Sequence, residues 1–297
     1  MHKQGVSIRV VNHKQIDRTK WEQFVLEHRF GTVFHTPFIF DVYSATKGYE
    51  AFALFIVDDA DSIQAMLLGF IQTVFNTNIL NINKRLVLLN SPVYNSKDAL
   101  DKLLCAYKSI YLNKGVYTEV RNHYDCQSVS DVYNKHGYRY HEHLNIIVNL
   151  LDDEEKLWND VSTRRRKEIR HGMKEQFTFT QVEPKDYEDF YNVLSDIYQR
   201  AKLPLVDKSF FDALWKRGSQ NVRLLGLYDS ETLVGAVVLL IHKKTVYGLY
   251  GGSKAVYYPR RPNDFLFWQV FLWAKQNGFH TYDWMGAGEP NKPYGVR

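Results

Sequence analysis

One stretch of the sequence, residues 246–288, constrains the fold of this chain most strongly. Its opening segment, 246–253, alternates apolar residues and ends in paired glycines, which predicts a strand that a second backbone or a ligand can approach closely. The prolines of 257–262 prevent that segment from being helical where they stand. A helical pattern of apolar residues follows, and a second predicted strand places Asp283 directly before the glycine turn 285–288. A strand, a helix N-terminus and a strand that ends in an acid commonly form a site for an anionic acyl donor.

The helix inside this stretch has a recognisable beginning and end. Asn263 is predicted to be its N-cap, and Asp264 suits the first turn because the helix dipole favours a negative charge there. Apolar residues at helical spacing continue as far as Gly278, which is predicted to end the helix.

The composition fits a soluble globular protein whose length favours two domains of ordinary size. Of the 297 residues, 45% are hydrophobic and 24% are charged, which is normal for such proteins. The formal charge, 38 − 33 = +5, mildly favours anionic partners and does not single out nucleic acid. Cys105 and Cys126 follow no metal-binding or disulfide spacing, so we expect a reducing compartment and no structural zinc.

Neither a targeting segment nor a membrane span is predicted. The first residues lack the apolar core of a signal peptide, and no apolar run approaches the length that crosses a bilayer. We therefore expect a cytoplasmic protein without a transmembrane segment.

The order of predicted elements in the first half of the chain recurs in the second half. The first half reads as strand 7–11, helix 17–28, a short helix ending near residue 47, a hairpin of 51–57 with 65–74, strand 85–89, helix 97–112, strand 116–121, a helix ending near residue 136 and strand 144–150. The second half reads as strand 177–182, helices 187–201 and 209–217, and a hairpin of 222–228 with 233–241, before the stretch described above. This repeated order predicts an α/β (α+β) chain of two similar domains, each a mixed, largely antiparallel sheet flanked by helices.

The most basic stretch of the chain, 152–176, lies between the two halves. The apolar stripe of its predicted helix consists of Leu157, Trp158, Val161, Ile169 and Met173. The remainder of that helix is crowded with Arg164, Arg165, Arg166, Lys167, Arg170, His171 and Lys174. A face of this kind is often simply solvated. Four adjacent basic side chains nevertheless repel one another, and a phosphate, a diphosphate or a nucleic acid would relieve that repulsion.

Three motifs stand out in the second half. They are Arg166-Lys-Glu-Ile-Arg170 with Lys174, Tyr258-Pro-Arg-Arg-Pro-Asn263 before the predicted helix, and Tyr282-Asp-Trp-Met-Gly286 at the end of the last strand. Together they resemble the Fem-type aminoacyltransferases, the enzymes of the peptidoglycan interpeptide bridge, which are related to GNAT-like acyltransferases. The resemblance implies two tandem GNAT-like domains, 1–151 and 152–297, the second of which opens with the basic helix.

The resemblance also implies a function. The chain would be an acyltransferase that modifies an amine of a cell-envelope or peptidoglycan precursor. Its anionic donor would be an aminoacyl-tRNA or an acyl-CoA, its acceptor a nucleotide-linked or lipid-linked amine, and tRNA a candidate partner. Family members commonly continue beyond a Tyr-Gly-Val stretch, here 294–296, into a Phe-Lys segment, so a truncated or trimmed chain is expected. The helical hairpin of some bridge enzymes, thought to assist tRNA binding, has no counterpart in this sequence, which weighs against tRNA.

The loop 254–262 bears on the choice of donor. GNAT domains that use acetyl-CoA commonly bind its diphosphate through the backbone N–H groups of a glycine-rich loop. This loop has no glycine, and its two prolines lack N–H groups, so an ordinary coenzyme A site is not expected here. The side-chain charges of Arg260 and Arg261 are the candidate replacement.

Acyl transfer to an amine requires removal of a proton from nitrogen and hydrogen-bond donors for the developing oxyanion. Asp283 and Glu289 are the candidate catalytic bases, and the glycine-rich strand ends are expected to offer N–H groups. The alternative for Asp283 is a strand-end residue that caps its own turn. The sequence has no Gly-x-Ser-x-Gly elbow and no persuasive Cys-His pair, so no covalent intermediate is expected.

The residues expected to bind substrate or phosphate are Arg166, Arg170, Lys174, Tyr257, Tyr258, Arg260, Arg261 and Asn263. His141 and His143 share one face of a predicted strand, but no nearby carboxylate or thiol completes a metal site, so neither a metal nor a permanently bound cofactor is expected. Two other functions stay open. One is acyl-CoA-dependent transfer to another small-molecule amine, and the other is a non-catalytic binding module that keeps the groove.

Overall fold

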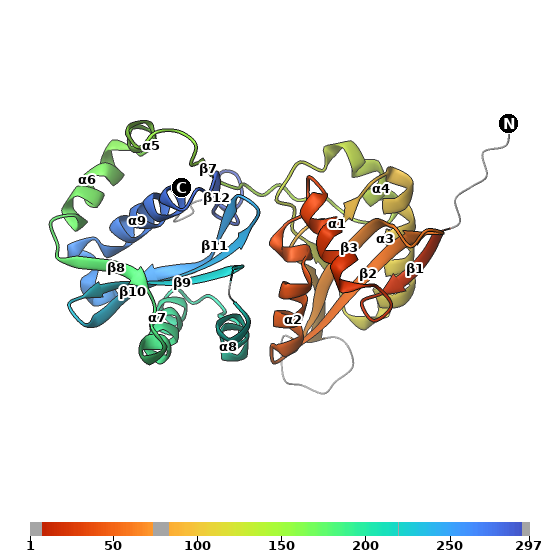
Figure 1. The fold of residues 1–297 in the computed structure, drawn as a ribbon, viewed down its shortest axis with the longest axis horizontal. Coiled ribbons are helices and arrows are strands. Elements are labelled where there is room, and N and C mark those ends of the chain that lie inside the picture. The colour runs from red at the N-terminus through yellow and green to blue at the C-terminus, as the bar shows by residue number, and fades with distance from the viewer. Residues whose placement is uncertain (1–7, 74–82, 219, 293–297) are drawn as a thin grey trace. The chain divides into compact units, whose positions relative to one another are not determined.

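The computed structural model describes residues 8–73, 83–218 and 220–292, and the chain forms two compact units (Figure 1). The first unit runs from Met1 to His141 and the second from Glu142 to Arg297. Within the described ranges, each unit contains one six-stranded sheet flanked by helices. The predicted fold class, two mixed and largely antiparallel sheets flanked by helices, is confirmed.

The first unit is built on a sheet with strand order β1-β2-β3-β4-β6, in which β5 pairs with β3. Neighbouring strands are antiparallel except β4 and β6, which are parallel. The elements are β1 (Ile8–Asn12), α1 (Arg18–Glu27), η1 (Val33–His35), α2 (Pro37–Ala45), β2 (Tyr49–Asp58), β3 (Ile63–Thr73), β4 (Lys84–Leu88), β5 (Val93–Tyr94), α3 (Lys97–Tyr111), η3 (Leu112–Lys114), β6 (Thr118–Val120), η4 (Gln127–Val129) and α4 (Ser130–Lys135).

Local sequence determines where the longer helices of this unit begin. Asp17, Thr36 and Ser96 are the N-caps of α1, α2 and α3, and each side chain accepts a hydrogen bond from a backbone N–H in the first turn. The buried face of α3 then packs on β2, β3 and β4 to form the core of the unit. This core sets the positions of β4 and β6.

The second unit is built on a sheet with strand order β7-β12-β11-β10-β9-β8. Only β11 and β12 are parallel among its neighbouring strands. The elements are β7 (Ile147–Asn149), α5 (Glu154–Asp160), α6 (Thr163–Gly172), β8 (Phe177–Gln181), η5 (Pro184–Asp186), α7 (Tyr187–Arg200), α8 (Lys208–Arg217), β9 (Val222–Asp229), β10 (Thr232–His242), β11 (Thr245–Ser253), η6 (Ala255–Arg260), α9 (Pro262–Gln276) and β12 (Thr281–Asp283).

Helices cover both faces of the second sheet (Figure 1). A Cβ added at Gly251 would lie 3.2 Å from the Phe267 ring of α9, whereas one at Gly252 would lie 3.2 Å from Ile197 of α7. Because successive residues of a strand point to opposite faces, α9 and α7 pack on opposite faces of β11. The core of the unit lies between α9 and the central strands, where Leu227, Val237 and Leu239 are inaccessible to solvent.

The strand predicted at the end of the first half belongs to the second sheet. Residues 147–149 form β7, which pairs antiparallel with β12 from Thr281↔Asn149 to Asp283↔Ile147. The sequence shows the apolar alternation of this strand but not its partner, which lies more than a hundred residues further along the chain. The compact units accordingly divide between residues 141 and 142, before the expected division after residue 151.

Two further expectations about the second unit are wrong in detail. The basic stretch forms two helices rather than one, because Val161 is extended and Ser162 caps a new helix by accepting the N–H of Arg165. The N-cap of α9 is Arg261 rather than Asn263, since Pro262 takes the first helical position, where a missing N–H costs nothing. The end of the strand predicted for 65–74 and the stretch 294–296 lie outside the described residues.

Candidate functional site

The two parallel strands of the second sheet diverge after three residue pairs. β12 pairs with β11 only from Thr245↔Thr281 to Tyr247↔Asp283, whereas β11 continues along β10 as far as Ser253. The extra residue Leu249 forms a β-bulge against β10, and a bulge bends and twists its strand. From residue 248 to 253, the β11 edge that faces β12 has no strand partner among the described residues. We call the space between this edge and residues 284–288 the split.

Tyr282 closes the narrow end of the split. Its side chain is fully buried, and its hydroxyl occupies the place where a Cβ on Gly248 would stand. Burial raises the pKa of Tyr282, and the neighbouring Asp283 charge raises it further, so the hydroxyl stays protonated. Its oxygen has no hydrogen-bond partner among the described residues. Position 248 therefore requires glycine while Tyr282 stands there.

Asp283, the first candidate base, is bonded into the turn that follows it. Its Oδ1 accepts hydrogen bonds from the Met285 N–H (2.7 Å) and from Asn145 Nδ2 (2.9 Å), and only 3% of the residue is exposed. This geometry is the one expected for the alternative in which Asp283 caps its own turn. The carboxylate is thus bonded to the backbone of the turn and to Asn145.

Asn145, which the sequence analysis did not single out, holds the same turn. Its Oδ1 accepts the N–H of Gly286 (2.8 Å) and that of Ile146 (2.9 Å). The Ala287 N–H donates to the Leu144 carbonyl (2.7 Å). The N–H groups of Met285, Gly286 and Ala287 thus all donate within the protein. The expectation that this turn offers N–H groups to an oxyanion is therefore wrong, because Asp283, Asn145 and Leu144 accept them.

Aromatic side chains fill the α9 side of the split. The Trp284 ring lies 4.7 Å from Phe267 and 5.3 Å from Tyr282, centroid to centroid, and Phe271 packs on Tyr282 at 5.1 Å. Phe267 also faces Gly251 of β11. A ligand in the split would therefore lie along its backbone edges rather than between α9 and the sheet.

Glu289, the second candidate base, follows the turn at the protein surface. It is exposed, and its carboxylate pairs with Lys292 at 2.5 Å. The side chain thus differs from Asp283, which is buried behind the turn.

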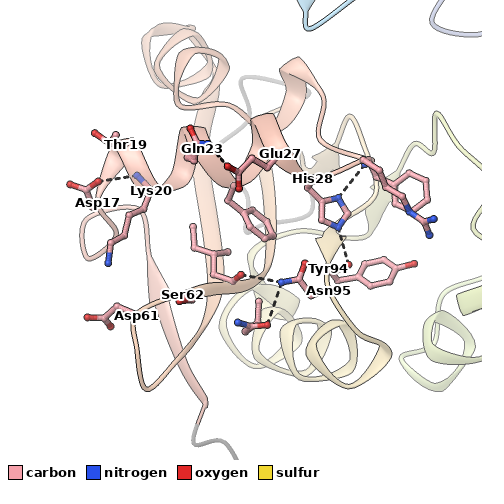
Figure 2. Close-up of a pocket in the computed structure, with 15 residues that line it drawn as sticks. Asp17, Thr19, Lys20, Gln23, Glu27, His28, Asp61, Ser62, Tyr94 and Asn95 are labelled. Carbon is pink, nitrogen blue, oxygen red and sulfur yellow. Dashed lines mark hydrogen bonds between the residues drawn. The ribbon is translucent and has the colours of Figure 1, made fainter.

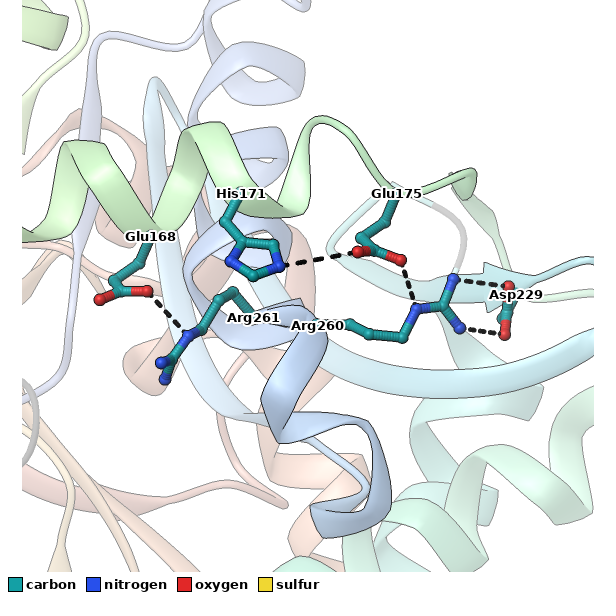
Figure 3. Close-up of polar contacts among 6 residues, drawn as sticks. All are labelled: Glu168, His171, Glu175, Asp229, Arg260 and Arg261. Atoms are coloured by element: carbon teal, nitrogen blue, oxygen red, sulfur yellow. Dashed lines mark hydrogen bonds and ion pairs between the residues drawn. The ribbon is translucent and has the colours of Figure 1, made fainter.

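Figure 3 shows that the two candidate anion-binding arginines at the start of α9 face carboxylates. Arg260 donates through both terminal nitrogens to Asp229 and through Nε to Glu175. Its hydrogen bond to Asp229 raises the pKa of Arg260 and lowers that of Asp229, and the Glu175 bond raises the arginine pKa further. Arg261 makes one pair, from Nε to Glu168 Oε2 at 2.8 Å. The charge expected to bind a diphosphate is therefore already balanced at Arg260.

α6 is attached to the start of α9 by these pairs and by close packing. Glu168 lies on α6, and Arg165 of the same helix pairs with Asp264 in the first turn of α9 at 2.9 Å. A Cβ at Gly172 would lie 2.6 Å from Phe265 Cβ and 3.1 Å from the Arg261 carbonyl oxygen. The absence of a side chain at Gly172 lets α6 lie directly against the N-terminus of α9.

The outer face of α6 keeps its cations. Arg164, Lys167 and Lys174 are exposed and form no ion pair with any described residue. Arg170 lies over the Trp158 ring at 5.1 Å, and Arg166 donates to Asn159 (3.1 Å) and Thr163 (3.3 Å). We call Arg164, Arg166, Lys167 and Arg170 of α6, together with Lys174 just beyond its end, the cationic face of α6.

The remaining predicted binding residues lie around η6. Arg200 of α7 donates to the Tyr258 hydroxyl, and its guanidinium lies 5.0 Å from the centre of that ring. Tyr257 is half-buried at the edge of the core. Asn263 lies in the first turn of α9, and its Oδ1 is buried without a hydrogen-bond partner among the described residues.

In the first unit, buried side chains fill the place that corresponds to the split. β4 and β6 are parallel and pair from Leu86↔Thr118 to Leu88↔Val120. Just beyond β4, Ser91 is fully buried, its hydroxyl bonds to that of Tyr133, and the Cys126 thiol donates to it at 3.6 Å. Burial raises the pKa of both Tyr133 and Cys126, so these groups stay neutral. The second unit is therefore the better candidate for the site.

The first unit also carries an open surface groove of about 950 Å³ beside α1 (Figure 2). Several polar groups on its wall bind within the wall. Asp17 accepts the Lys20 N–H (2.9 Å), and His28 bonds to the Tyr94 carbonyl (3.1 Å) and the Phe30 N–H (3.1 Å). The Asp17 carboxylate and the His28 ring are therefore engaged within the wall.

No group of three or more His, Cys, Asp or Glu side chains in the described ranges could hold a metal ion. Across the same ranges, none of the helices combines the length and the apolar composition that crossing a bilayer requires.

Four residues that bind the predicted site residues were not predicted from the sequence: Asn145, Asp229, Glu168 and Glu175. Each lies far along the chain from the residue it binds, as with Asp229 and Arg260, which are 31 positions apart. A search for charge complementarity between α6 and 260–264 could have found the two glutamates. No local signal marks Asn145.

Comparison with known proteins identifies the second unit. Residues 158–294 match the model of the acetyltransferase (GNAT) domain family. No curated protein sequence matches the chain.

Solved structures resemble both units together. The crystal structure of FemX has a TM-score of 0.73 and 14% identity, with 97% of this chain and 92% of that chain covered. The C-terminal domain of a putative lysylphosphatidylglycerol synthetase from Agrobacterium fabrum has a TM-score of 0.58 and 12% identity, with 92% and 78% covered. L-PGS from Bacillus licheniformis has a TM-score of 0.56 and 16% identity, with 93% and 80% covered. The expected resemblance to a Fem-type, GNAT-like family is thus confirmed: residues 158–294 match the GNAT acetyltransferase domain, and the chain as a whole resembles FemX in fold.

Proposed function

We propose that the second unit transfers an aminoacyl or acyl group to an amine of a cell-envelope precursor, and that the reaction takes place in the split. The observation that carries this proposal is the unpaired β11 edge from residue 248 to 253. A strand edge presents backbone N–H groups at fixed positions, and these can stabilise the oxyanion of a reacting carbonyl. The donor carbonyl would lie along this edge.

We prefer an aminoacyl-tRNA as the donor, although the sequence lacks the helical hairpin that is thought to assist tRNA binding in some bridge enzymes. A coenzyme A diphosphate would need N–H groups and free positive charge at the start of α9. Pro259 and Pro262 lack N–H groups there, Arg260 is bound by two carboxylates, and α6 packs on the helix end at Gly172. The cationic face of α6, by contrast, keeps exposed charge that suits a nucleic acid backbone.

The preferred acceptor is an amine on a nucleotide-linked or lipid-linked precursor. The resemblance to FemX supports the peptidoglycan precursor, and the resemblance to a lysylphosphatidylglycerol synthetase supports cell-envelope chemistry in general. We propose the location that such an acceptor requires, the cytoplasm.

The proposed reaction converts the aminoacyl ester of the donor into an amide. The amine nitrogen attacks the ester carbonyl carbon, the C–O bond to the tRNA ribose breaks, and the departing ribose oxygen takes up the proton that the nitrogen loses. An amide and a free tRNA result. Asp283, bonded to Met285 and Asn145, would position the turn on one side of the split rather than accept this proton.

Two other functions have observations in their favour. The matching family model is that of an acetyltransferase, which favours an acyl-CoA donor and another small-molecule amine. The aromatic side chains of Phe267, Tyr282 and Trp284 on the α9 side favour a non-catalytic binding module.

A donor panel separates the three functions. The protein is incubated with a mixture of aminoacyl-tRNAs or with a panel of acyl-CoAs, together with nucleotide-linked muropeptides, and product masses are read by mass spectrometry. We expect a mass gain of one aminoacyl residue, which disappears when the tRNA is digested with ribonuclease beforehand. A product from acyl-CoA alone would establish the second function. Acceptor binding without any product would establish the third.

A further inference from the structure

The glycine turn after β12 presents carbonyl oxygens to the split. The Gly286 N–H donates to Asn145 and the Ala287 N–H to Leu144, so both point toward the segment that leads into β7. No cis peptide bond occurs among the described residues, and in a trans peptide the carbonyl points opposite to the N–H of the next residue. The carbonyls of Met285 and Gly286 therefore point away from residues 144–145.

The strand order shows what lies in that direction. β12 stands between β7 and β11, so a group that points away from the β7 side points toward β11 and into the split. Neither the Met285 nor the Gly286 carbonyl accepts a hydrogen bond from any described residue. Gly286 is buried, and a buried carbonyl normally has a partner.

The backbone here is held in an unfavourable conformation. Met285 has a φ of +61°, which is uncommon for a residue with a side chain, and Gly286 has a φ of +131°. Asp283 and Asn145 maintain this conformation by accepting the N–H groups of Met285 and Gly286. Strained backbone that the surroundings maintain is concentrated at functional sites.

We propose that the Met285 and Gly286 carbonyls bind the N–H groups of the acceptor amine, and that Asn145 is a positioning residue for the reaction. This inference rests on the proposed function for its substrate class, a primary amine. The two walls of the split then differ chemically: the β11 edge includes N–H donors for the acyl carbonyl, whereas the turn offers acceptors only.

Hydrogen bonds to both carbonyls would also orient the attacking amine. A neutral primary amine has two N–H groups and one lone pair. When two carbonyls on one wall accept both N–H groups, the lone pair points to the opposite wall, where the acyl carbonyl lies along β11. The turn would thus select amines over hydroxyl acceptors, which have one hydrogen to donate.

A single NMR signal tests the binding step without any turnover. Met285-Gly286 is the one Met-Gly dipeptide in the sequence, so labelling Met with ¹³C at the carbonyl and Gly with ¹⁵N isolates this peptide. The probe is L-alaninamide, and its N,N,N-trimethyl analogue keeps the charge and the carboxamide but has no N–H on the α-nitrogen. We expect a saturable shift of the Met285 carbonyl with alaninamide and none with the analogue. Equal shifts, or no shift with either, would overturn the proposal.

Variants test the role of Asn145. Asn145→Ala should raise the KM for the amine about tenfold or more and leave kcat less affected, because it loosens a wall that binds. Asn149→Ala is the matched control, since Asn149 also accepts a nearby N–H, that of Leu151 at 3.2 Å, but does not contact the turn. An equal rise in KM for both variants would count against the proposal.

An exchange of the pair keeps the test valid if Asn145→Ala unfolds the protein. Asn145→Asp combined with Asp283→Asn restores a donor and an acceptor at the same positions. We expect this double variant to recover the Met285 carbonyl shift with alaninamide, whereas Asn145→Asp alone should not, because two carboxylates would then face each other. If the natural protein shows the carbonyl shift but forms no product in the donor panel, the proposed function is disproved and this inference still stands.

Discussion

Asn145 Nδ2 donates a 2.9 Å hydrogen bond to Asp283 Oδ1, although the two residues are 138 positions apart in the chain. The bond joins the segment before β7 to the end of β12, and both partners also hold backbone N–H groups of the turn at Met285 and Gly286. An acid that looks catalytic in the sequence is thus engaged in the structure. This relationship leads to a specific expectation for Asp283.

Asp283→Asn should be a mild change. An asparagine at 283 still presents an oxygen to the Met285 N–H and to Asn145, so the turn keeps its cap. We expect a loss of about 1 kcal/mol in the free energy of unfolding, in the range for a weakened cap. Turnover should fall less than tenfold.

Turnover and thermal melting on one preparation check this prediction. Asp283→Ala, which removes the oxygen as well as the charge, is the comparison and should lower both quantities more. If Asp283→Asn instead keeps the melting temperature and lowers turnover by roughly 10² or more, Asp283 acts as a general base.

Acid should remove the contribution of Arg260 to stability. The hydrogen bond from Arg260 lowers the pKa of Asp229 from its ordinary value of 3.8. A carboxylate with a lowered pKa stabilises the fold above its unfolded value, and this contribution is lost as the pH falls through the folded value. The difference in melting temperature between the natural protein and Arg260→Ala should therefore be constant at neutral pH and shrink below pH 3.8.

Melting curves from neutral pH down to about pH 2, which spans the carboxylate titration range, measure this difference. Arg217→Ala is the control, because Arg217 lies exposed in the last turn of α8 and forms no ion pair with a described residue. A gap between Arg260→Ala and the natural protein that stays constant into acid would show that Arg260 acts through packing on the Phe177 ring, 4.6 Å away.

The cationic face of α6 should bind RNA through charge alone. Lys167→Ala combined with Lys174→Ala should weaken the binding of deacylated bulk tRNA. The slope of log affinity against log salt concentration should fall by about two, one for each lysine removed. Fluorescence anisotropy at several salt concentrations measures both quantities. Lys14→Ala with Lys20→Ala, exposed lysines of the first unit, makes the same change in net charge. Similar slopes for the two double variants would leave the α6 face merely solvated.

Much of the fold could be predicted because its signals are local. The hairpins β2–β3 and β9–β10, and the helices α3 and α9, show their period and their turns in consecutive residues. β7 was assigned to the wrong half because pairing between distant strands leaves no local trace. The break between α5 and α6 depends on Ser162, the N-cap of α6. In the sequence, the run of basic residues that follows hides this capping signal.

The site could be predicted less well, for the same physical reason. The stretch 246–288 located the diverging strands, the glycine turn and the start of α9. The partners of its charged residues could not be read from it. Asp229 and Glu175 neutralise Arg260, and Asn145 binds Asp283, across long loops of chain. A charge in the sequence indicates where an anion could bind only after its internal partners are known.

Gly248→Ala should disturb the narrow end of the split through one neighbour. The new methyl group would stand where the Tyr282 hydroxyl lies, inside a core that cannot expand freely, so we expect a loss of roughly 1–3 kcal/mol in the free energy of unfolding. Gly235→Ala is the control, because its methyl group meets its neighbours at 3.3 Å or more.

Tyr282→Phe then isolates the cause. The hydroxyl has no hydrogen-bond partner among the described residues, so its removal alone should change stability little. In the Tyr282→Phe background, Gly248→Ala should cost less than it does in the natural protein, although the ring carbon at 2.8 Å keeps the contact tight. Urea unfolding of the two single variants and the double variant gives the coupling free energy, which we expect to reach at least about 0.5 kcal/mol, the lower end for residues in contact. A coupling near zero would mean that another neighbour, not the tyrosine hydroxyl, makes glycine necessary at 248.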